Sequence, residues 1–548
     1  MTEQTSQLLS RQSRFRPSAW SIGAALIALI VVMPILAVLW FAATPSDNIW
    51  PHLVSTTLPR YLRNTAVLMV GVGLLTALIG TITAWLVVMY RFPGAGWLQW
   101  ALLMPLAVPA YVGAYALVDL LEYAGPVQTA LRDMFGWETA RDYWFPQVRT
   151  RGAAMIVLSV SLYPYVYILA RAAFREQSGA TYDVARALGA GPLARFWRVG
   201  LPLARPAVAA GVAVVMMETV NDFGTVDYFS VQTLTTGIFS VWRQGGNLGG
   251  AAQIATCVLA IIVLLVGLER FGRRRSKVAN NARNARPVSK SPLRGRKAVF
   301  AFFVCFLPVA LGFILPVTVI ISHAFDAQQW TAPGLIAAIL RTLFICAAAA
   351  LLTVVGGVFM VYGVRMSGRR LPTLLMPITA LGYAAPGAVL ALGILVPLAA
   401  FDNKVADAIW GWTGRDPGLL LTGTAAALVL AYVVRFFAIA QGTADAAFGR
   451  ISPSLPMASR SLGYGPGATL RAVHIPLLRA SIGSALLLVF VDCVKELPAT
   501  LMLYHEDTLA TRVHAKASLE NLSEAAPAAL MITLVGLAAV ALLARANR

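Results

Sequence analysis

Long apolar runs separated by short polar connections dominate the chain. Each run approaches or exceeds the roughly 20 residues that a helix needs to cross a bilayer. Backbone polar groups without hydrogen-bond partners are too costly in hydrocarbon, so these runs predict membrane helices. The first is too long for the core of a signal peptide, and we expect it to be retained. The twelve runs lie near 20–42, 64–90, 97–121, 152–172, 206–230, 253–269, 298–322, 342–364, 372–400, 418–438, 480–503 and 526–544.

Composition supports the same class of protein. Apolar residues make up 58% of the chain and charged residues 12%, and the mean hydropathy is +0.71. These values exclude an ordinary soluble globule and predict an all-α polytopic membrane protein. The cysteines lie in apolar runs without CxxC spacing, so we expect packing residues rather than disulfides or a zinc site. They are Cys257, Cys305, Cys346 and Cys493.

Basic residues in the connections predict the orientation. The stretch 270–297 carries eleven Lys and Arg residues and no acid. If this linker and both termini are cytoplasmic, the outer connections hold 11 basic and 13 acidic residues, so the net charge of +20 lies on the inner side. Those connections are 43–63, 122–151, 231–252, 323–334, 401–416 and 504–525. This bias accounts for the basic linker, and we expect no nucleic-acid partner.

The chain carries an internal duplication. "RALGAGP" at 186–192 returns as "RSLGYGP" at 460–466, and Pro202 returns as Pro476 at the same offset of 274. We therefore predict a first six-helix half over 1–269, the linker 270–297, and a second six-helix half over 298–548. A parallel repeat predicts two similar bundles about a pseudo-two-fold axis along the membrane normal.

The duplicated stretches fall between the fourth and fifth helix of each half, near 176–203 and 450–477. Each predicts a short amphipathic helix, a glycine break, and a second short helix that ends at a proline. Such a hairpin suits docking of a soluble partner, although a helix pair lying on lipid headgroups has the same pattern.

Four acids lie inside apolar runs. Glu218 and Asp222 become Asp492 and Glu496 on adding the offset of 274, and each pair has i, i+4 spacing on one helix face. At about 1.5 Å per residue, the second pair would lie about 17 and 23 Å from the inner end of its helix. An acid in hydrocarbon costs about 2.5–3.5 kcal/mol, so we expect the acids to line a polar pathway. A structural network with Lys495 is the alternative.

The repeated loops resemble the EAA loop of ABC-importer permeases, EAA-x3-G-x9-I-x-L-P. The first copy places Asp183, Val184, Ala185, Gly189, Val199, Leu201 and Pro202 on this pattern, and the second copy Met457, Ala458, Ser459, Gly463, Val473, Ile475 and Pro476. The acidic position is kept as Asp183 and lost at Met457. The resemblance implies the type I importer fold and coupling of both loops to a cytoplasmic ATPase, through Asp183, Ala185, Gly189, Pro202, Ala458, Gly463 and Pro476. The chain has no G-x-x-x-x-G-K-[ST] loop, so ATP and magnesium belong to a separate ATPase subunit, expected in two copies.

"NDFGTVDYF" at 221–229 and "VDCVKELPATLML" at 491–503 resemble one branch of that family, the single-chain permeases of ferric-iron importers. This resemblance covers essentially the full length. It implies a multi-pass protein of the bacterial inner membrane that works with a periplasmic binding protein, and transient Fe(III) contacts at the four acids. Fe(III) is a hard cation suited to carboxylate oxygen. We expect no catalytic residue and no cofactor bound by this chain.

Two other functions remain open at this stage. The acids also suit an importer of a polyamine, thiamine or an aminophosphonate. An ion-coupled secondary carrier would share the twelve helices and the 6 + 6 repeat, but the repeated loops disfavour it. The five histidines form no ligand cluster, which disfavours a membrane-embedded enzyme.

Overall fold

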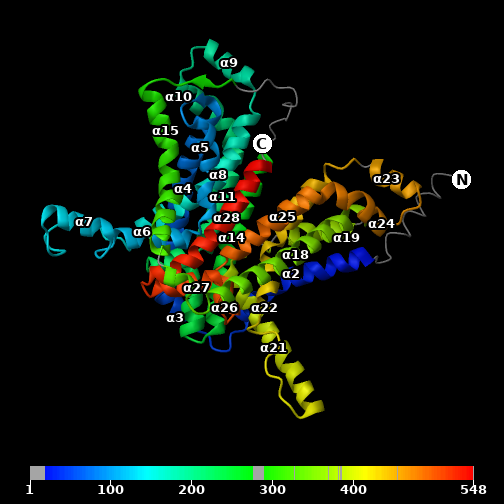
Figure 1. Cartoon of the computed structure of the whole chain (residues 1–548). Coiled ribbons are helices and arrows are strands. Elements are labelled where there is room, and N and C mark those ends of the chain that lie inside the picture. Colours follow the sequence, from blue (N-terminus) through cyan, green and yellow to red (C-terminus); the bar gives the residue numbers. More distant parts are fainter. Residues whose placement is uncertain are drawn as a thin grey trace. The chain divides into compact units, whose positions relative to one another are not determined.

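The structure, a computed structural model, describes residues 19–275, 289–325, 327–367, 370–379, 382, 385–452 and 454–546. These residues are almost entirely helical (Figure 1). In the described part of the chain the only sheet is a parallel pair of two-residue strands, β1 (Tyr90–Arg91) and β2 (Ser291–Pro292). The part of the linker described from residue 289 on is thus held, through Ser291 and Pro292, against the end of the second membrane helix.

Eleven helices in the described residues are long and apolar enough to cross a membrane, and a bent pair can supply a twelfth. The bent pair spans Ala95–Ala107 and Ala110–Phe135, with an angle of 92° between its two parts. Lengths and hydropathy therefore confirm a polytopic protein. The long helices are α2 (Ala19–Ala43), α4 (Leu58–Met89), α8 (Arg151–Glu176), α11 (Leu201–Asn221), α14 (Leu248–Arg275), α15 with α16 (Arg296–Val309 and Leu315–Ala324), α18 (Leu335–Ser367), α21 (Gly387–Thr413), α22 (Ala425–Phe448), α25 (Ile475–Lys495) and α28 (Leu522–Ala546).

The predicted spans near 372–400 and 418–438 need correction. The first is divided into α19 (Arg370–Thr379) and α21, and α21 continues to Thr413 through the predicted outer connection 401–416. Helix α22 begins at Ala425 and continues ten residues past the predicted end, to Phe448. Asp402 lies within α21 and accepts hydrogen bonds from the backbone nitrogens of Leu421 and Thr422 (2.9 and 2.6 Å), which holds the connection before α22 against α21.

The two halves repeat the same local devices. Helices α11 and α25 are each 21 residues long and begin 274 residues apart. The third span of each half breaks at a proline that caps the helix after it, Pro109 before α6 (Ala110–Leu121) and Pro386 before α21. In the second span of each half, a glycine contacts the backbone of a neighbouring helix, and the two glycines, Gly80 and Gly357, lie 277 residues apart. A Cβ on Gly80 would lie 2.9 Å from the backbone nitrogen of Tyr167, and one on Gly357 would lie 3.0 Å from that of Gln441. These glycines let paired helices approach closely.

Packing divides the chain differently from the sequence halves. One compact unit contains the described residues of Met1–Thr44 and Leu340–Glu506, and the other those of Pro45–Ile339 and Asp507–Arg548. Each half thus gives its first helix to the other unit: α2 packs on α19 and α21, and α15 packs on α4 and α5 (Ala95–Ala101). Glycines again permit the contact, since a Cβ on Gly393 would overlap the backbone of Pro34, and one on Gly312 would overlap the backbone of Val160. The predicted ranges 1–269 and 298–548 describe the repeat, whereas the units describe how helices pack.

All four cysteines are free thiols. Short helices connect the long ones. Helix α7 projects from the rest of its unit, as does the end of α21 from the other (Figure 1). The short helices are α3 (Trp50–Ser55), α7 (Pro126–Phe135), α9 (Gly179–Ala187), α10 (Pro192–Arg195), α12 (Gly224–Tyr228), α13 (Leu234–Phe239), α17 (Ala327–Trp330), α23 (Ser454–Ser461), α24 (Pro466–Thr469), α26 (Pro498–Leu503) and α27 (Leu509–Ser518).

Candidate functional site

The two predicted loops form the helix–glycine–helix hairpins that the sequence indicates. Helices α9 and α10 flank Gly189, and α23 and α24 flank Gly463. Both glycines have left-handed backbone, with φ of +78° and +84°, and an added Cβ on either would meet no atom within 4 Å. Backbone conformation rather than crowding therefore requires glycine at each bend.

The second short helix of each hairpin does not end at the predicted proline. It continues through a π-helical turn, Phe196–Gly200 or Leu470–His474, into α11 or α25. The residue before each proline, Leu201 or Ile475, bonds five residues back rather than four. Proline lacks an N–H and its ring crowds the preceding turn, and the wider turn accommodates both. Pro202 and Pro476 consequently lie in the first turn of the membrane helices.

The predicted coupling residues are largely accessible. Asp183 and Ala458 are exposed and Ala185 is half-buried. Beside the bends, Leu188 and Leu462 occupy equivalent positions and are 82% and 76% exposed. Solvent-exposed leucines at both tips suit contact with another protein.

Asp222 ends α11 and starts the short helix after it. Its Oδ1 accepts hydrogen bonds from the backbone nitrogens of Thr225 and Val226 (both 3.1 Å), and its Oδ2 accepts one from the Thr225 hydroxyl (2.9 Å). Within the described residues, no basic side chain lies within 4.0 Å of this carboxylate. The acid thereby caps α12 where the membrane helix breaks.

Glu496 caps the short helix that follows α25, as Asp222 caps the one that follows α11. Its Oε1 accepts a hydrogen bond from the backbone nitrogen of Ala499 (3.1 Å), which caps α26. Its Oε2 lies 3.7 Å from Nη2 of Arg435, and the two side chains are 5% and 11% exposed. A Cβ on Gly387 would overlap this carboxylate, so the start of α21 also abuts it.

Arg435 corrects the sequence interpretation. Its place near the predicted helix end at 438 indicates a side chain that reaches toward the interface. The structure places it well inside α22, buried and paired with Glu496. The basic partner of Glu496 in this ion pair is Arg435, and not the neighbouring Lys495.

Glu218 and Asp492 lie one turn before the two breaks, and both are half-buried. Within each unit the two acids share a helix and its broken end, as the i, i+4 spacing predicts. The approach of the two pairs to one another concerns two separate units and stays a prediction.

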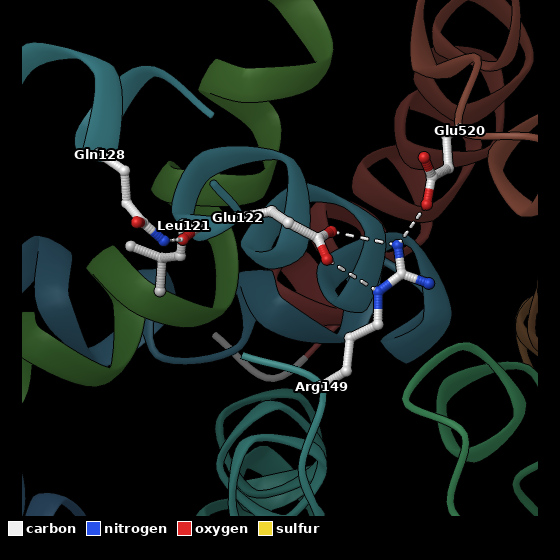
Figure 2. Close-up of polar contacts among 5 residues, drawn as sticks. All are labelled: Leu121, Glu122, Gln128, Arg149 and Glu520. Atoms are coloured by element: carbon white, nitrogen blue, oxygen red, sulfur yellow. Dashed lines mark hydrogen bonds and ion pairs between the residues drawn. The ribbon is translucent and has the colours of Figure 1, made fainter. Parts of the chain in front are cut away.

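A polar network that sequence reasoning missed lies just before the start of α8, at the end of that helix away from the first loop. Figure 2 shows its contacts among Glu122, Arg149 and Glu520. Arg149 donates from Nε and Nη2 to both carboxylate oxygens of Glu122 (3.1 Å each), and Nη2 also lies 2.7 Å from Glu520. Its guanidinium stands 5.1 Å from the ring centre of Tyr228. The hydrogen bond to Glu122 raises the pKa of Arg149 above its ordinary value. The sequence pattern does not indicate this network because its residues lie up to 371 positions apart in the chain.

Two acids that the sequence places at helix ends join histidines in the same unit. Asp119 lies 3.0 Å from Nε2 of His323, and Asp227 lies 3.9 Å from Nε2 of His514. Across the described residues, no three His, Cys, Asp or Glu side chains are arranged to hold a metal ion. Iron contacts at Glu218, Asp222, Asp492 and Glu496 stay a prediction.

These features define a class. Membrane-length helices arranged as two copies, each with a glycine-bent hairpin leading into a broken fifth helix, form a polytopic membrane transport subunit.

Comparison with known proteins specifies the family. Residues 70–277 match the family described as binding-protein-dependent transport system inner membrane component. The chain therefore carries a domain of this family of permeases. It is 26% identical to the Fe(3+)-transport system permease protein FbpB 2 of Haemophilus influenzae, over 95% of this chain and 96% of that protein. The putative ferric transport system permease protein FbpB 1 of the same organism is 23% identical, over 90% of this chain and 78% of that protein.

A half-length relative accords with the duplication. The molybdenum transport system permease protein ModB of Escherichia coli is 29% identical over 36% of this chain, which covers 87% of ModB. These 207 residues, 36% of this chain, therefore correspond to most of a permease of that kind.

Proposed function

We propose that this permease carries ferric iron from the periplasm to the cytoplasm in an ATP-driven, binding-protein-dependent importer. The observation that carries the proposal is likeness along essentially the full chain to a permease named for Fe(3+) transport. Substrate would arrive on a periplasmic binding protein, enter between the two sets of helices, and leave when access alternates.

The two hairpins support an external motor. An ATPase subunit, in two copies, would bind one hairpin each, through the surfaces that include Asp183 and Ala458 and the exposed leucines beside the bends. ATP and magnesium would bind to those subunits, and the permease itself would hold no cofactor. Closure of the ATPase pair would move each hairpin, and the continuous helix from α10 into α11, or α24 into α25, would transmit that movement to the broken helix end.

The acids support a cationic cargo. Glu218, Asp222, Asp492 and Glu496 supply the hard oxygen donors that Fe(III) favours. ModB of Escherichia coli is named for molybdenum and CysT of the same organism for sulfate, and they match only 36% and 46% of the chain. A polyamine, thiamine or an aminophosphonate is the alternative cargo that carboxylates also suit.

The orientation follows from charge. We infer a bacterial inner-membrane location with both termini, the basic linker and the two coupling hairpins in the cytoplasm. In this orientation the Arg149 network would lie on the periplasmic side, where the binding protein would deliver its cargo.

Reconstitution tests this function. Proteoliposomes would contain the permease with a candidate ATPase and a candidate ferric-binding protein from the same organism, and uptake of radiolabelled iron would be measured. We expect accumulation that requires all three components and ATP. Competition by unlabelled polyamine, thiamine or aminophosphonate identifies the alternative cargo. Uptake driven by a proton or sodium gradient without the ATPase would refute the importer and favour the secondary carrier.

A further inference from the structure

Basic side chains gather at the ends of α4 and α8 nearest the first hairpin. Arg171 and Arg175 lie one turn apart at the end of α8, and Arg91 follows the end of α4. Lys290 reaches the same place from the linker and donates from Nζ to the backbone oxygen of Val87 at 3.0 Å. The pairing of β1 with β2 holds the linker there. Four cations from three segments therefore share one end of this helix pair.

The acids of the protein do not neutralise this basic cluster. Arg171 donates from Nη2 to Oε1 of Gln99 (3.0 Å), and its guanidinium lies 4.8 Å from the ring centre of Trp100. Among the described residues, no carboxylate lies within 4.0 Å of any of the four cations, and Glu176, next to Arg175 in the chain, forms no ion pair with them. The linker contains no acid at all.

The four charges also act on one another. Partial burial, and then the positive charges of Arg171, Arg175 and Arg91, lower the pKa of Lys290 below its ordinary value. Like charges at i, i+4 on one helix face repel. The C-terminal end of a helix carries about half a negative charge, which offsets only a small part of the total. An anion bound among these side chains would relieve the repulsion.

The second half supplies its own acid at the equivalent place. The stretch "ARAAF" at 170–174 returns as "ADAAF" at 444–448, so Asp445 occupies the position of Arg171. Asp445 lies 2.7 Å from Nη2 of Arg365, on the second span of its half. A carboxylate can therefore balance the charge at this end of the helix pair, and the first half has a cation in its position.

The segments beside the basic cluster present exposed aromatic side chains. Helix α15 begins shortly after β2 and packs on α4 and α5. Trp97 of α5 is 49% exposed, and Phe300 and Phe303 of α15 are 71% and 59% exposed. Cations at helix ends next to exposed apolar surface match the two parts of a phospholipid, its charged headgroup and its acyl chains.

We propose that the phosphate of an anionic lipid headgroup binds among Arg91, Arg171, Arg175 and Lys290, with the acyl chains along the exposed aromatic side chains of α5 and α15. Guanidinium groups bind phosphate oxygens in pairs, and basic pockets on the cytoplasmic side of membrane helices accept lipid headgroups. The bound lipid would join the linker to the ends of α4 and α8, beside the first hairpin. The choice of leaflet rests on the orientation proposed above, and the site does not depend on the cargo.

The test uses the purified full-length permease. Its melting temperature would be measured in detergent as phosphatidylglycerol is added, with phosphatidylcholine and inorganic phosphate as comparisons at matched ionic strength. Native mass spectrometry would record the lipid retained after purification. We expect phosphatidylglycerol to be retained and to raise the melting temperature in a saturable way, and phosphatidylcholine to do neither. An equal rise with inorganic phosphate would identify a site for the free anion and overturn the lipid assignment.

Matched variants locate the response. Arg171→Gln with Arg175→Gln removes two cations and should weaken the apparent affinity for phosphatidylglycerol by about tenfold or more. Arg171→Asp installs the residue of the second half and should likewise reduce lipid retention. Arg205→Gln removes an exposed cation from α11 of the same unit and should respond like the wild-type protein. The proposal is overturned if phosphatidylglycerol acts no more strongly than phosphatidylcholine, if the double variant binds it as tightly as the wild-type protein, or if Arg205→Gln loses as much as the double variant.

Discussion

The buried pair of Arg435 and Glu496 offers the sharpest energetic prediction. Opposite charges 3.7 Å apart attract by about 4–5 kcal/mol at an effective dielectric constant of about 20. Arg435→Met removes one charge and leaves the other buried, which typically costs about 3–5 kcal/mol. We expect the lower end of that range, because the backbone nitrogen of Ala499 still donates to Glu496.

The costs of Glu496→Gln and of the double variant, which complete a double-mutant cycle, can be estimated from the same contacts. Glu496→Gln leaves the guanidinium buried but keeps an oxygen for Ala499, and should cost about 2–3 kcal/mol. The double variant removes both charges and should cost about 1–2 kcal/mol, since replacing a whole buried pair is mild. The two single costs therefore exceed the double cost by about 3 kcal/mol or more.

Unfolding in mixed micelles titrated with dodecyl sulfate, followed by tryptophan fluorescence, measures each free energy. Asp222→Asn is the matched control in the first half, because its amide oxygen still accepts from Thr225 and Val226 and no buried arginine is left unpaired. We expect it to cost less than about 1 kcal/mol. Additive single and double costs, or an Asp222→Asn cost equal to that of Glu496→Gln, would refute the reasoning.

Three further predictions concern the loops, the acids and the opposite end. Gly189→Val and Gly463→Val force a left-handed backbone on a branched residue, at about 1–2 kcal/mol each, and should reduce co-purification of the ATPase without loss of the membrane helices; unaltered co-purification argues against docking there. Asp492→Asn with Glu496→Gln should abolish uptake measured per folded permease, and normal transport would make those acids structural. Arg149→Gln should destabilise its unit by about 1 kcal/mol in the same micelle assay, because its partners are partly exposed, and a cost above about 3 kcal/mol would contradict that solvent screening.

Features that depend on local sequence were predictable. The hairpins follow from a glycine at a fixed distance before a proline, and the repeat at an offset of 274 makes the assignment in one half a check on the other. The breaks after Asp222 and Glu496 follow from Gly224 and Pro498, which weaken a helix where an acid can cap the next one.

Features that depend on distant contacts were not predictable. Hydropathy predicts that the tenth helix ends near 438, which would place Arg435 close to an interface, whereas α22 continues ten residues further. The partner of Arg435 is 61 residues away on another helix, and no pattern along the chain indicates the pair. Helices α2 and α15 each pack in the unit that contains most of the other half. Close contacts at glycines, such as Gly393 against Pro34, permit this packing, and no pattern along the sequence indicates them.

The two breaks separate the structural task of the acids from their task in transport. Both halves keep an acid at the cap, Asp222 or Glu496, but only the second half adds a buried arginine; Ser161 stands in that place in the first. The cap therefore works without the ion pair. Neither Glu218 nor Asp492 is needed to start the short helix that follows, so a change in charge there leaves the break intact.

The acids one turn before the caps consequently give the cleaner transport test. Glu218→Gln with Asp492→Asn should lower the rate of iron uptake while unfolding stays close to wild type. Asp222→Asn with Glu496→Gln should change stability and uptake together, since it alters the caps and the Arg435 pair. Uptake that follows stability in both double variants would mean that the four carboxylates hold the broken helices and that cargo contacts lie elsewhere.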